Sequence, residues 1–375
     1  MVRQFLCAVI AVTVVSEESQ SQLNSSLDTP TDPRSVAMGE SHVALQGNHS
    51  ALMSNPAGLA GIHGAGGWYA QRTIDWVHYL ESFRYHSANA YAETPYGVLA
   101  VQYNHFTEGE IDVASLSSSS PYGYVTAKAS AYYHTIALGF ARNMVGGLSA
   151  GITAKYHDFV MSWVGNAPRG ASLPSTTPAW LFDAGLIYSF LFPRAESGIE
   201  HGVSAGTSIQ NVGTRLKSDL TSGGVETHSA EQLPQYWRLG FSYALRVLPG
   251  DAGGWEPVSV LVTTEYRRMF GGDRVYEAFR DYWGFGLETT IYDLVSIRAG
   301  GVIMPYTSIY GEKGKPMFRM GAGLHIPFHR LGAEIPLVIS GNYTFIPILQ
   351  YPTYYPYSDK SNLSAFSFAL HYEFN

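Results

Sequence analysis

The segment "FGLETTIYDLVSIRAGG" (residues 285–301) predicts two strands joined by a tight turn. Ile291 and Val295 flank the turn on the apolar face of this hairpin. Antiparallel pairing about Asp293 then sets Glu288 directly opposite Arg298 on the polar face. Opposite charges at such positions stabilise paired strands by about 0.2–1 kcal/mol, so we predict an ion pair between these two side chains. The segment therefore indicates an antiparallel sheet with one apolar face and one polar face.

The same period of two continues along most of the chain, which predicts an all-β fold. In "SAFSFALHYEFN" (364–375), large apolar residues from Phe366 to Phe374 alternate with small or polar ones, and "MFRMGAGLHIPF" (317–328) repeats the pattern. Fourteen alternating segments are expected, near residues 66–74, 82–93, 96–106, 126–142, 146–158, 180–192, 200–212, 236–248, 257–269, 282–291, 295–304, 317–328, 335–347 and 364–374.

The links between these segments alternate between long and short. Long links are expected near residues 107–125, 159–179, 213–235, 270–281, 305–316 and 348–363. This alternation of long and short links is typical of outer-membrane barrels with an even number of strands. It is not expected in a sandwich with Greek-key connections. The segments also match the roughly 9–11 residues that a tilted strand needs to cross hydrocarbon. We therefore predict a fourteen-stranded antiparallel transmembrane β-barrel over residues 66–375. Its polar face, with Glu288 and Arg298, would line the lumen.

The composition fits a sheet whose outer surface is not all in water. Only 14% of the 375 residues are charged, against about 25% in a typical soluble protein. Aromatic residues also reach 14%, with 26 Tyr, and many of them are expected in girdles at the membrane interfaces. Asp and Glu (30) outnumber Lys and Arg (23), so nothing indicates a nucleic-acid partner.

The first sixteen residues resemble a secretory signal peptide. Arg3 gives a positive start, residues 5–15 are apolar, and Val14 and Ser16 are small enough for the cleavage positions. The apolar run is too short to cross a bilayer as a helix, which takes about 20 residues. Cys7 is the only cysteine and lies within the signal, so cleavage would leave no disulfide or cysteine ligand. An exported barrel is expected in the bacterial outer membrane.

Motifs for catalysis or metal binding are not found in the sequence. The thirteen histidines are scattered, and there is no HExxH, CxxC, GxSxG or P-loop pattern. We therefore expect no enzyme, no catalytic residues, no metal and no cofactor. The Ser-rich residues 115–124 and the Tyr-rich residues 349–362 are interpreted as surface loops, or as landing sites for an apolar ligand or an adhesive surface.

Several glycines fall on the predicted inward face, and two interpretations stay open. They relieve the coiling of the strands, or they leave space in the lumen for a plug or a ligand. The residues concerned are Gly151, Gly240, Gly286, Gly300, Gly321 and Gly323.

Residues 17–65 precede the first strand and contain a distinctive motif. "PRSVAMGESHVALQGNHSALMSNPAGLAGI" (33–62) runs from a Met-Gly stretch to Asn55-Pro56-Ala57. This resembles the N-terminal signature of the FadL/TodX family of outer-membrane transporters for hydrophobic compounds. "LPQYWRLGFSYAL" (233–245) and residues 283–301 are similar to the PorV-like branch of the same superfamily.

The resemblance implies a fourteen-stranded barrel whose N-terminal segment, residues 17–65, folds into the lumen as a hatch or plug. It assigns the hatch motif to Asn55, Pro56 and Ala57, and it places no ligand-contacting residue. It also implies passive uptake of hydrophobic compounds, with long-chain fatty acids as the expected substrate. The barrel-assembly machinery would recognise the C-terminal strand, although Asn375 follows the usual terminal aromatic, here Phe374.

Two other functions stay open. A PorV-like barrel would bind a protein partner in secretion or surface attachment. A structural or adhesive barrel would act at the cell surface without transport. Transport predicts an apolar path from the outer loops to the hatch, whereas partner binding predicts ordered outer loops with an apolar groove.

Overall fold

The structure is a computed structural model that describes residues 27, 30–73, 84–117, 120–165, 173–193, 198–222, 225–248, 255–273, 281–303, 316–346 and 363–374. The predicted signal peptide (1–16) with Cys7 lies outside these residues, and so does the Tyr-rich segment 349–362.

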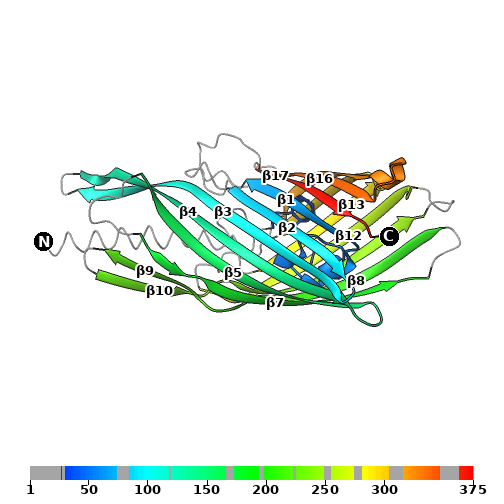
Figure 1. The fold of residues 1–375 in the computed structure, drawn as a ribbon, viewed down its shortest axis with the longest axis horizontal. Helices are drawn as coiled ribbons and strands as arrows, with labels where there is room; N and C mark the ends of the chain where they lie inside the picture. The colour runs from blue at the N-terminus through cyan, green and yellow to red at the C-terminus, as the bar shows by residue number, and fades with distance from the viewer. Residues whose placement is uncertain are drawn as a thin grey trace.

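Fourteen strands close into one antiparallel barrel, which confirms the predicted fold and strand number (Figure 1). Each strand pairs with the next one along the wall, and β1 pairs with β17 to close it, with Trp68 opposite Ala369. The wall strands are β1 (Ala65–Thr73), β2 (Arg84–Thr94), β3 (Gly97–Ser117), β4 (Ser120–Asn143), β5 (Leu148–Val164), β7 (Ala179–Leu191), β8 (Ile199–Gly213), β11 (Gln235–Val247), β12 (Val258–Gly271), β13 (Asp281–Ile291), β14 (Val295–Ile303), β15 (Pro316–Pro327), β16 (Leu337–Ile346) and β17 (Leu363–Tyr372).

The outer face of the wall is strongly apolar. Side chains alternate between buried and exposed along each strand, and the exposed set is mostly aliphatic and aromatic. Leu138 is 60% exposed and Ile152 is 63% exposed, although both are large apolar residues. A soluble protein rarely exposes apolar surface this extensive and continuous. None of the helices among the described residues is long and apolar enough to span a membrane.

Three strands run far beyond this apolar belt, and here the sequence-based loop assignment was wrong. β3 and β4 stay paired as far as Ser117 and Ser120, through most of the predicted loop 107–125 and its Ser-rich stretch. The predicted loops 159–179 and 213–235 contain the end of β5 and a small sheet of β6 (Ser175–Thr177), β9 (Leu216–Ser222) and β10 (Val225–Glu231). Figure 1 shows this outer extension at the left. The Ser-rich sequence of these paired ends resembles that of a loop.

At the opposite end of the barrel, tight turns link β2 to β3 and β13 to β14, and we call this end the turn end. Between β13 and β14, the backbone N–H of Leu294 donates to the carbonyl oxygen of Ile291 at 3.0 Å. Tyr292 and Asp293 both have φ of 53°, the left-handed conformation of the two central residues of a type I′ turn. This turn sets Glu288 opposite Arg298, the register expected from the sequence.

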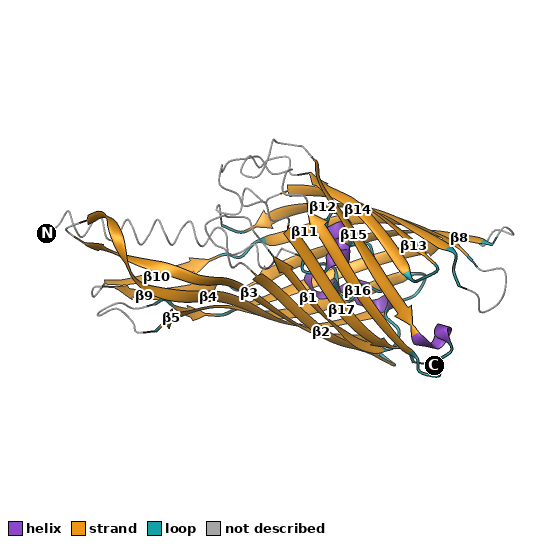
Figure 2. Cartoon of the chain, turned by 90° about the horizontal axis from the view of Figure 1, so that it is seen from above, coloured by secondary structure: helices purple, strands orange, loops and turns teal. Residues whose placement is uncertain are grey.

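Residues 30–64, which we call the lumen segment, lie inside the barrel. They form α2 (Pro33–Ala37) and the short 3-10 helices η2 (Ala51–Met53) and η3 (Pro56–Gly61), and a further 3-10 helix, η5 (Phe328–Leu331), follows β15. Figure 2 shows the helices of the segment enclosed by the strands. Most of the segment is buried, and it continues directly into β1 at the turn end.

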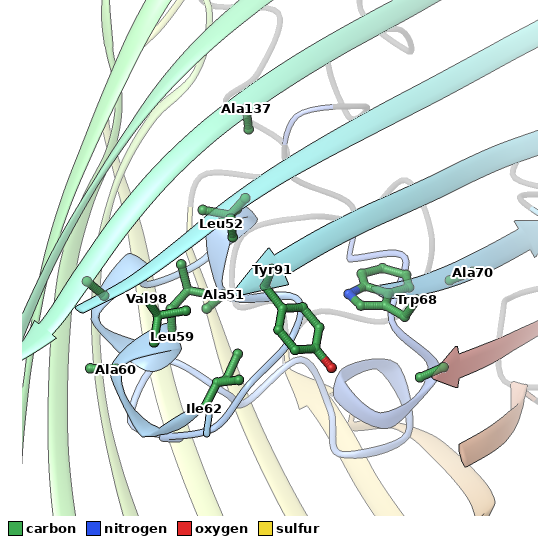
Figure 3. Packing of buried hydrophobic residues seen from close by; sticks show 13 residues of the cluster. Ala51, Leu52, Leu59, Ala60, Ile62, Trp68, Ala70, Tyr91, Val98 and Ala137 are labelled. Carbon is green, nitrogen blue, oxygen red and sulfur yellow. The ribbon is translucent and has the colours of Figure 1, made fainter. Parts of the chain in front are cut away.

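The lumen segment shares an apolar core with the inner wall. Leu52 and Leu59 are fully buried and pack with Trp68, Tyr91 and several small wall residues (Figure 3). Burying a leucine side chain contributes about 1.5–3 kcal/mol, so this cluster alone makes a substantial contribution to holding the segment against the wall.

Candidate functional site

The Asn55-Pro56-Ala57 motif docks η3 onto the barrel wall. The Asn55 side chain caps η3, because its Oδ1 accepts the N–H of Ala57 at 3.1 Å. Its Nδ2 donates to the carbonyl oxygen of Val43 at 2.7 Å and to that of Leu186, on β7, at 3.1 Å. Pro56 starts the helix, where its missing N–H costs nothing. Asn55 therefore joins the helix, the rest of the segment and the wall.

The wall makes room for this contact with glycines. A Cβ atom on Gly185 would lie 1.8 Å from Oδ1 of Asn55, and one on Gly151 would lie 2.4 Å from the carbonyl carbon of Pro56. At four further inward glycines that the sequence singled out, an added Cβ would approach Val43, Met38, Gly39 or Ala37; these are Gly240, Gly286, Gly300 and Gly321. At Gly323 it would meet Arg298 of the wall instead. Five of the six glycines thus give space to the lumen segment.

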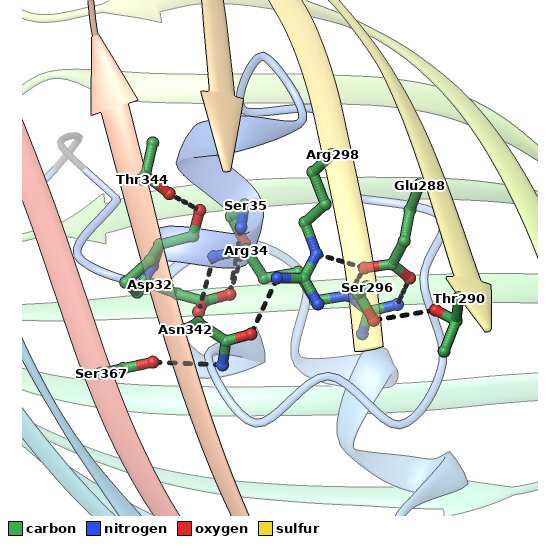
Figure 4. A network of polar contacts seen from close by, with 11 residues as sticks. Asp32, Arg34, Ser35, Glu288, Thr290, Ser296, Arg298, Asn342, Thr344 and Ser367 are labelled. Carbon is green, nitrogen blue, oxygen red and sulfur yellow. Dashed lines mark hydrogen bonds and ion pairs between the residues drawn. The ribbon is translucent and has the colours of Figure 1, made fainter. Parts of the chain in front are cut away.

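Glu288 holds α2 against the wall (Figure 4). Its carboxylate accepts two hydrogen bonds from Arg34, from Nε at 2.9 Å and from Nη2 at 2.7 Å. The same carboxylate accepts from Nε of Arg298. The structure therefore places the predicted pair Glu288 and Arg298 together, both nearly buried and facing the lumen, and adds Arg34 of the lumen segment, which the sequence did not indicate.

The polar contacts spread from this group along the wall. Arg298 Nη1 donates to Asn342 Oδ1 at 2.8 Å, and Asn342 in turn donates to Ser367 at 3.3 Å. At the start of α2, the carboxylate of Asp32 accepts the N–H groups of Arg34 and Ser35 at 3.2 Å. Such an N-cap stabilises a helix by about 0.5–2 kcal/mol.

Glu265 is a second point where a buried carboxylate holds the lumen segment. Its Oε2 accepts the backbone N–H groups of His42 and Val43 at 2.8 and 2.9 Å. Its Oε1 accepts from Nη1 of Arg238 at 2.8 Å and from the Tyr282 hydroxyl at 3.2 Å. Because Glu265 is only 1% exposed, these donors replace the water that an ionised carboxylate requires.

In the lumen segment, the pKa values of Glu40 and His49 are shifted strongly. Burial alone would raise the pKa of Glu40, but Arg319, Arg72 and Arg267 together lower it to about 2. Burial, with a smaller contribution from His371, lowers the pKa of His49 to about 4. The His49 ring stacks on Tyr91 with ring centroids 4.8 Å apart. At neutral pH the segment is therefore docked with Glu40 ionised and His49 neutral.

An apolar row lines the inner wall away from the turn end. Tyr85, Phe106, Tyr133 and Phe159 stand directly opposite one another on β2, β3, β4 and β5. The rings of Tyr85 and Phe106 are 5.9 Å apart, and those of Tyr133 and Phe159 are 4.6 Å apart. Further apolar side chains complete what we call the apolar cluster: Leu27, Met53, Ala179, Leu181, Leu216 and Leu233. The cluster joins five wall strands (β2, β3, β4, β5 and β7), the lumen segment and the outer extension.

A recess adjoins the apolar cluster, where the lumen segment faces the wall. Leu27, Met53 and Pro30 form its apolar part, whereas His42 and Arg238 belong to its polar part; Thr31, Ser50 and Gln102 complete the lining. Leu27 and Met53 thus belong to both features. The recess thus combines apolar side chains with the Arg238 guanidinium, which also bonds Glu265.

Sequence reasoning missed most of these residues. Arg34, Glu40 and Glu265 were not indicated, because their partners lie more than two hundred residues away in the chain. The alternation of "VSVLVTTEYRR" places Glu265 and Arg267 on the polar face, which is the only local signal. Among the described residues, no group of three or more His, Cys, Asp or Glu side chains is arranged to hold a metal ion.

Comparison with known proteins gives similarity of structure only. No protein-family model matches the chain, and no curated protein matches it. Among solved structures, it is similar to the toluene transporter TodX of Pseudomonas putida, with 12% identity, a TM-score of 0.45, and 91% of this chain and 96% of that chain covered. The toluene transporter TbuX of Ralstonia pickettii is similar at 11% identity and a TM-score of 0.44, with coverages of 92% and 98%. A FadL homologue of Pseudomonas aeruginosa is similar at 11% identity and a TM-score of 0.45, with coverages of 92% and 99%.

Proposed function

We propose that this protein is an outer-membrane channel for the passive passage of hydrophobic compounds, with the lumen segment as its hatch. The closed barrel and its apolar outer face support the placement in a membrane. In this proposal residues 1–16 direct export, residues 17–65 hold the hatch, residues 66–375 form the barrel, and the barrel-assembly machinery recognises β17. The lipid bilayer is then the partner of the outer face.

The apolar cluster is the observation that carries this proposal. A channel for polar solutes has a polar lumen, whereas here Tyr85, Phe106 and Tyr133 form an inward aromatic row. Small-molecule sites are mostly apolar and carry a few polar groups that orient the ligand. The cluster also touches the lumen segment through Met53, so a ligand that binds there contacts the proposed hatch.

Long-chain fatty acids are the proposed substrate class. The recess beside the cluster has apolar lining from Leu27 and Met53 and a guanidinium from Arg238. A fatty acid combines an alkyl chain with one carboxylate; the alkyl chain matches the apolar part, while the Arg238 guanidinium of the polar part also bonds Glu265. Passage down a concentration gradient needs no cofactor, and the hatch contacts give the closed state its stability.

The uptake of labelled oleate by liposomes that contain the purified barrel tests the proposal. We expect uptake above that of liposomes with an unrelated barrel of the same size, and no comparable uptake of a polar solute such as a sugar. If the folded protein gives no more oleate uptake than the unrelated barrel, the transport proposal is wrong.

One observation favours a second candidate, a PorV-like barrel that binds a protein. The paired strands β3 and β4 and the sheet of β6, β9 and β10 extend the barrel well beyond its apolar belt. Such an extension offers a surface to a partner. If this is the function, deletion of residues 216–231 will abolish partner capture and leave the barrel folded, whereas oleate uptake will be absent from the start.

A further inference from the structure

Three histidines stand side by side on the outer face of the barrel. His86, His105 and His134 are directly opposite one another on β2, β3 and β4, and Asp158 on β5 follows as the next position in the same row. All four alternate with the inward aromatic row, so their side chains point away from the lumen. We call these three histidines the histidine row.

The histidine row lies where the apolar belt ends. On β4, the outward residues on the turn-end side of His134 are Ile136 and Leu138, which are 45% and 60% exposed. Beyond the row on the other side, Lys128 is exposed and pairs with Glu110 at 3.0 Å. A change from apolar to charged outward residues marks the level of the lipid headgroups. In the membrane placement proposed above, the row stands at the height of lipid phosphates.

Aromatic hydroxyls and a few charges surround the row. The Tyr69 hydroxyl lies 2.7 Å from Nδ1 of His86, and Asp158 Oδ2 lies 4.0 Å from Nε2 of His134. The titratable or charged groups that face the row are Tyr69, Arg84, Tyr103, Tyr132, Tyr156 and Asp158. Among the groups just named, all of them in the described part of the chain, the protonated row and Arg84 carry four positive charges and Asp158 carries one negative charge.

The spacing of the imidazole rings fits a lipid surface better than a single small ligand or ion. The ring centroids of His86 and His105 are 6.3 Å apart, and the row runs along the sheet instead of converging on one atom. Imidazolium N–H groups form strong, charge-assisted hydrogen bonds with phosphate oxygens. Several phosphates at one level are found at a lipid surface.

We propose that the histidine row binds the phosphate groups of anionic membrane lipids and does so when its imidazoles are protonated. The proposal rests on the placement of the barrel in a membrane, but not on what passes through the lumen. Lipid selectivity and oleate uptake are measured separately, so either can fail without the other.

The selectivity of the lipids that contact the barrel tests this directly. The full-length barrel is placed in phosphatidylcholine vesicles, and electron spin resonance compares how strongly spin-labelled phosphatidylglycerol and phosphatidylcholine are immobilised. We expect a preference for phosphatidylglycerol of about two- to fivefold near pH 5 and little preference near pH 8, because imidazoles lose their charge between these values. The charge of phosphatidylglycerol is constant over this range, so the change comes from the protein.

The triple variant His86→Gln/His105→Gln/His134→Gln is expected to lose the pH-dependent preference. His105→Gln alone changes the middle of the row and should lose part of the pH-dependent preference. This single variant provides the test if the triple variant does not fold. His201→Gln is the matched control, because His201 also faces outward but stands near the turn end, stacked on Phe192. The proposal is overturned if the folded variants keep the wild-type preference, if wild type shows none, or if excess inorganic phosphate abolishes it, since the last outcome would indicate a free-phosphate site.

Discussion

The side-chain amide of Asn55 donates a hydrogen bond to the carbonyl oxygen of Leu186 at 3.1 Å, and so joins the lumen segment to β7. The two residues are 131 positions apart in the chain. The same amide group also bonds Val43 within the segment. A single side chain therefore couples the shape of the lumen segment to its position on the wall, and replacing it should loosen the segment more than it unfolds the barrel.

Asn55→Ala is the first test of this coupling. The variant loses the bonds to Val43, Leu186 and Ala57, each of which contributes about 0.5–1.5 kcal/mol. We expect the undocked fraction of the hatch to rise by about one to two orders of magnitude, seen as more frequent openings in planar-bilayer conductance. Heat-modifiable mobility on gels should be preserved.

Asn104→Ala is the matched control for that variant. Asn104 is equally buried, but its Oδ1 accepts from Ser87 and Gln102, both of which belong to the wall. It should lower the stability of the barrel without increasing its openings. If Asn55→Ala instead lost its heat-modifiable mobility while conductance stayed unchanged, the motif would serve the folding of the barrel rather than its closure.

Gly151→Ala, a change in the barrel wall, should displace the lumen segment. The added Cβ would stand 2.4 Å from the carbonyl carbon of Pro56, and neither backbone can move aside easily. Gly341→Ala is the control, because its Cβ would meet no atom closer than 3.9 Å. We expect more openings for the first variant and wild-type conductance for the second. Equal behaviour of the two would mean that the inward glycines serve strand coiling alone.

The strands of this barrel could be predicted from sequence because lipid and lumen impose opposite demands on alternate residues. The period of two in residues 364–374 and the hairpin at Asp293 follow directly from that, and so does the pairing of Glu288 with Arg298. Along the Ser-rich ends of β3 and β4 the period is lost, so the sequence could not distinguish these ends from a loop.

The contacts of the lumen segment could not be predicted in the same way. Asn55 has a local signal in its Asn-Pro step, but nothing near Leu186 or Glu265 shows that each faces a distant segment. Those contacts depend on how the segment folds within the closed barrel. The inward glycines left two interpretations open until the positions of Pro56 and Gly39 were known.

Glu265→Ala should destabilise the protein strongly. It removes the carboxylate that faces Arg238 and takes away the acceptor of two backbone N–H groups, at His42 and Val43. Breaking a buried ion pair from one side costs about 3–5 kcal/mol, and urea unfolding should show a loss of this size. Glu110→Ala, which breaks an exposed pair with Lys128, should cost about 0–1 kcal/mol. Similar losses for the two variants would contradict the role given to Glu265.

Docking of the hatch should weaken as the pH falls. The pKa of His49 is about 4 in the docked segment, below the ordinary value of about 6.5, so the undocked state binds more protons between these values. Stability is then lost on acidification through this window, and conductance should show more openings. Burial also lowers the pKa of His42, which acts in the same direction.

His49→Gln should flatten part of that pH dependence, and the contribution of His42 should remain. His228→Gln is the control, because His228 lies in the outer extension, exposed and paired with Asp219. An unchanged pH profile in His49→Gln would exclude His49 as the group responsible.

The apolar cluster should decide the rate of oleate uptake. Leu181 is 1% exposed and faces the cluster from β7, so Leu181→Asn places an amide where the alkyl chain would bind and should slow uptake. Val302→Asn is the control, because Val302 is equally buried but packs with Tyr282 and Met317, away from the cluster.

Leu27→Ala should act in the opposite direction. The Leu27 side chain occupies the cluster in the closed state, so a ligand has to displace it. Each methylene that the ligand no longer has to displace lowers the free-energy cost of ligand binding by about 0.8 kcal/mol. We therefore expect faster uptake at low oleate concentration. If Leu181→Asn and Val302→Asn slowed uptake equally, the passage of the ligand would not involve this wall.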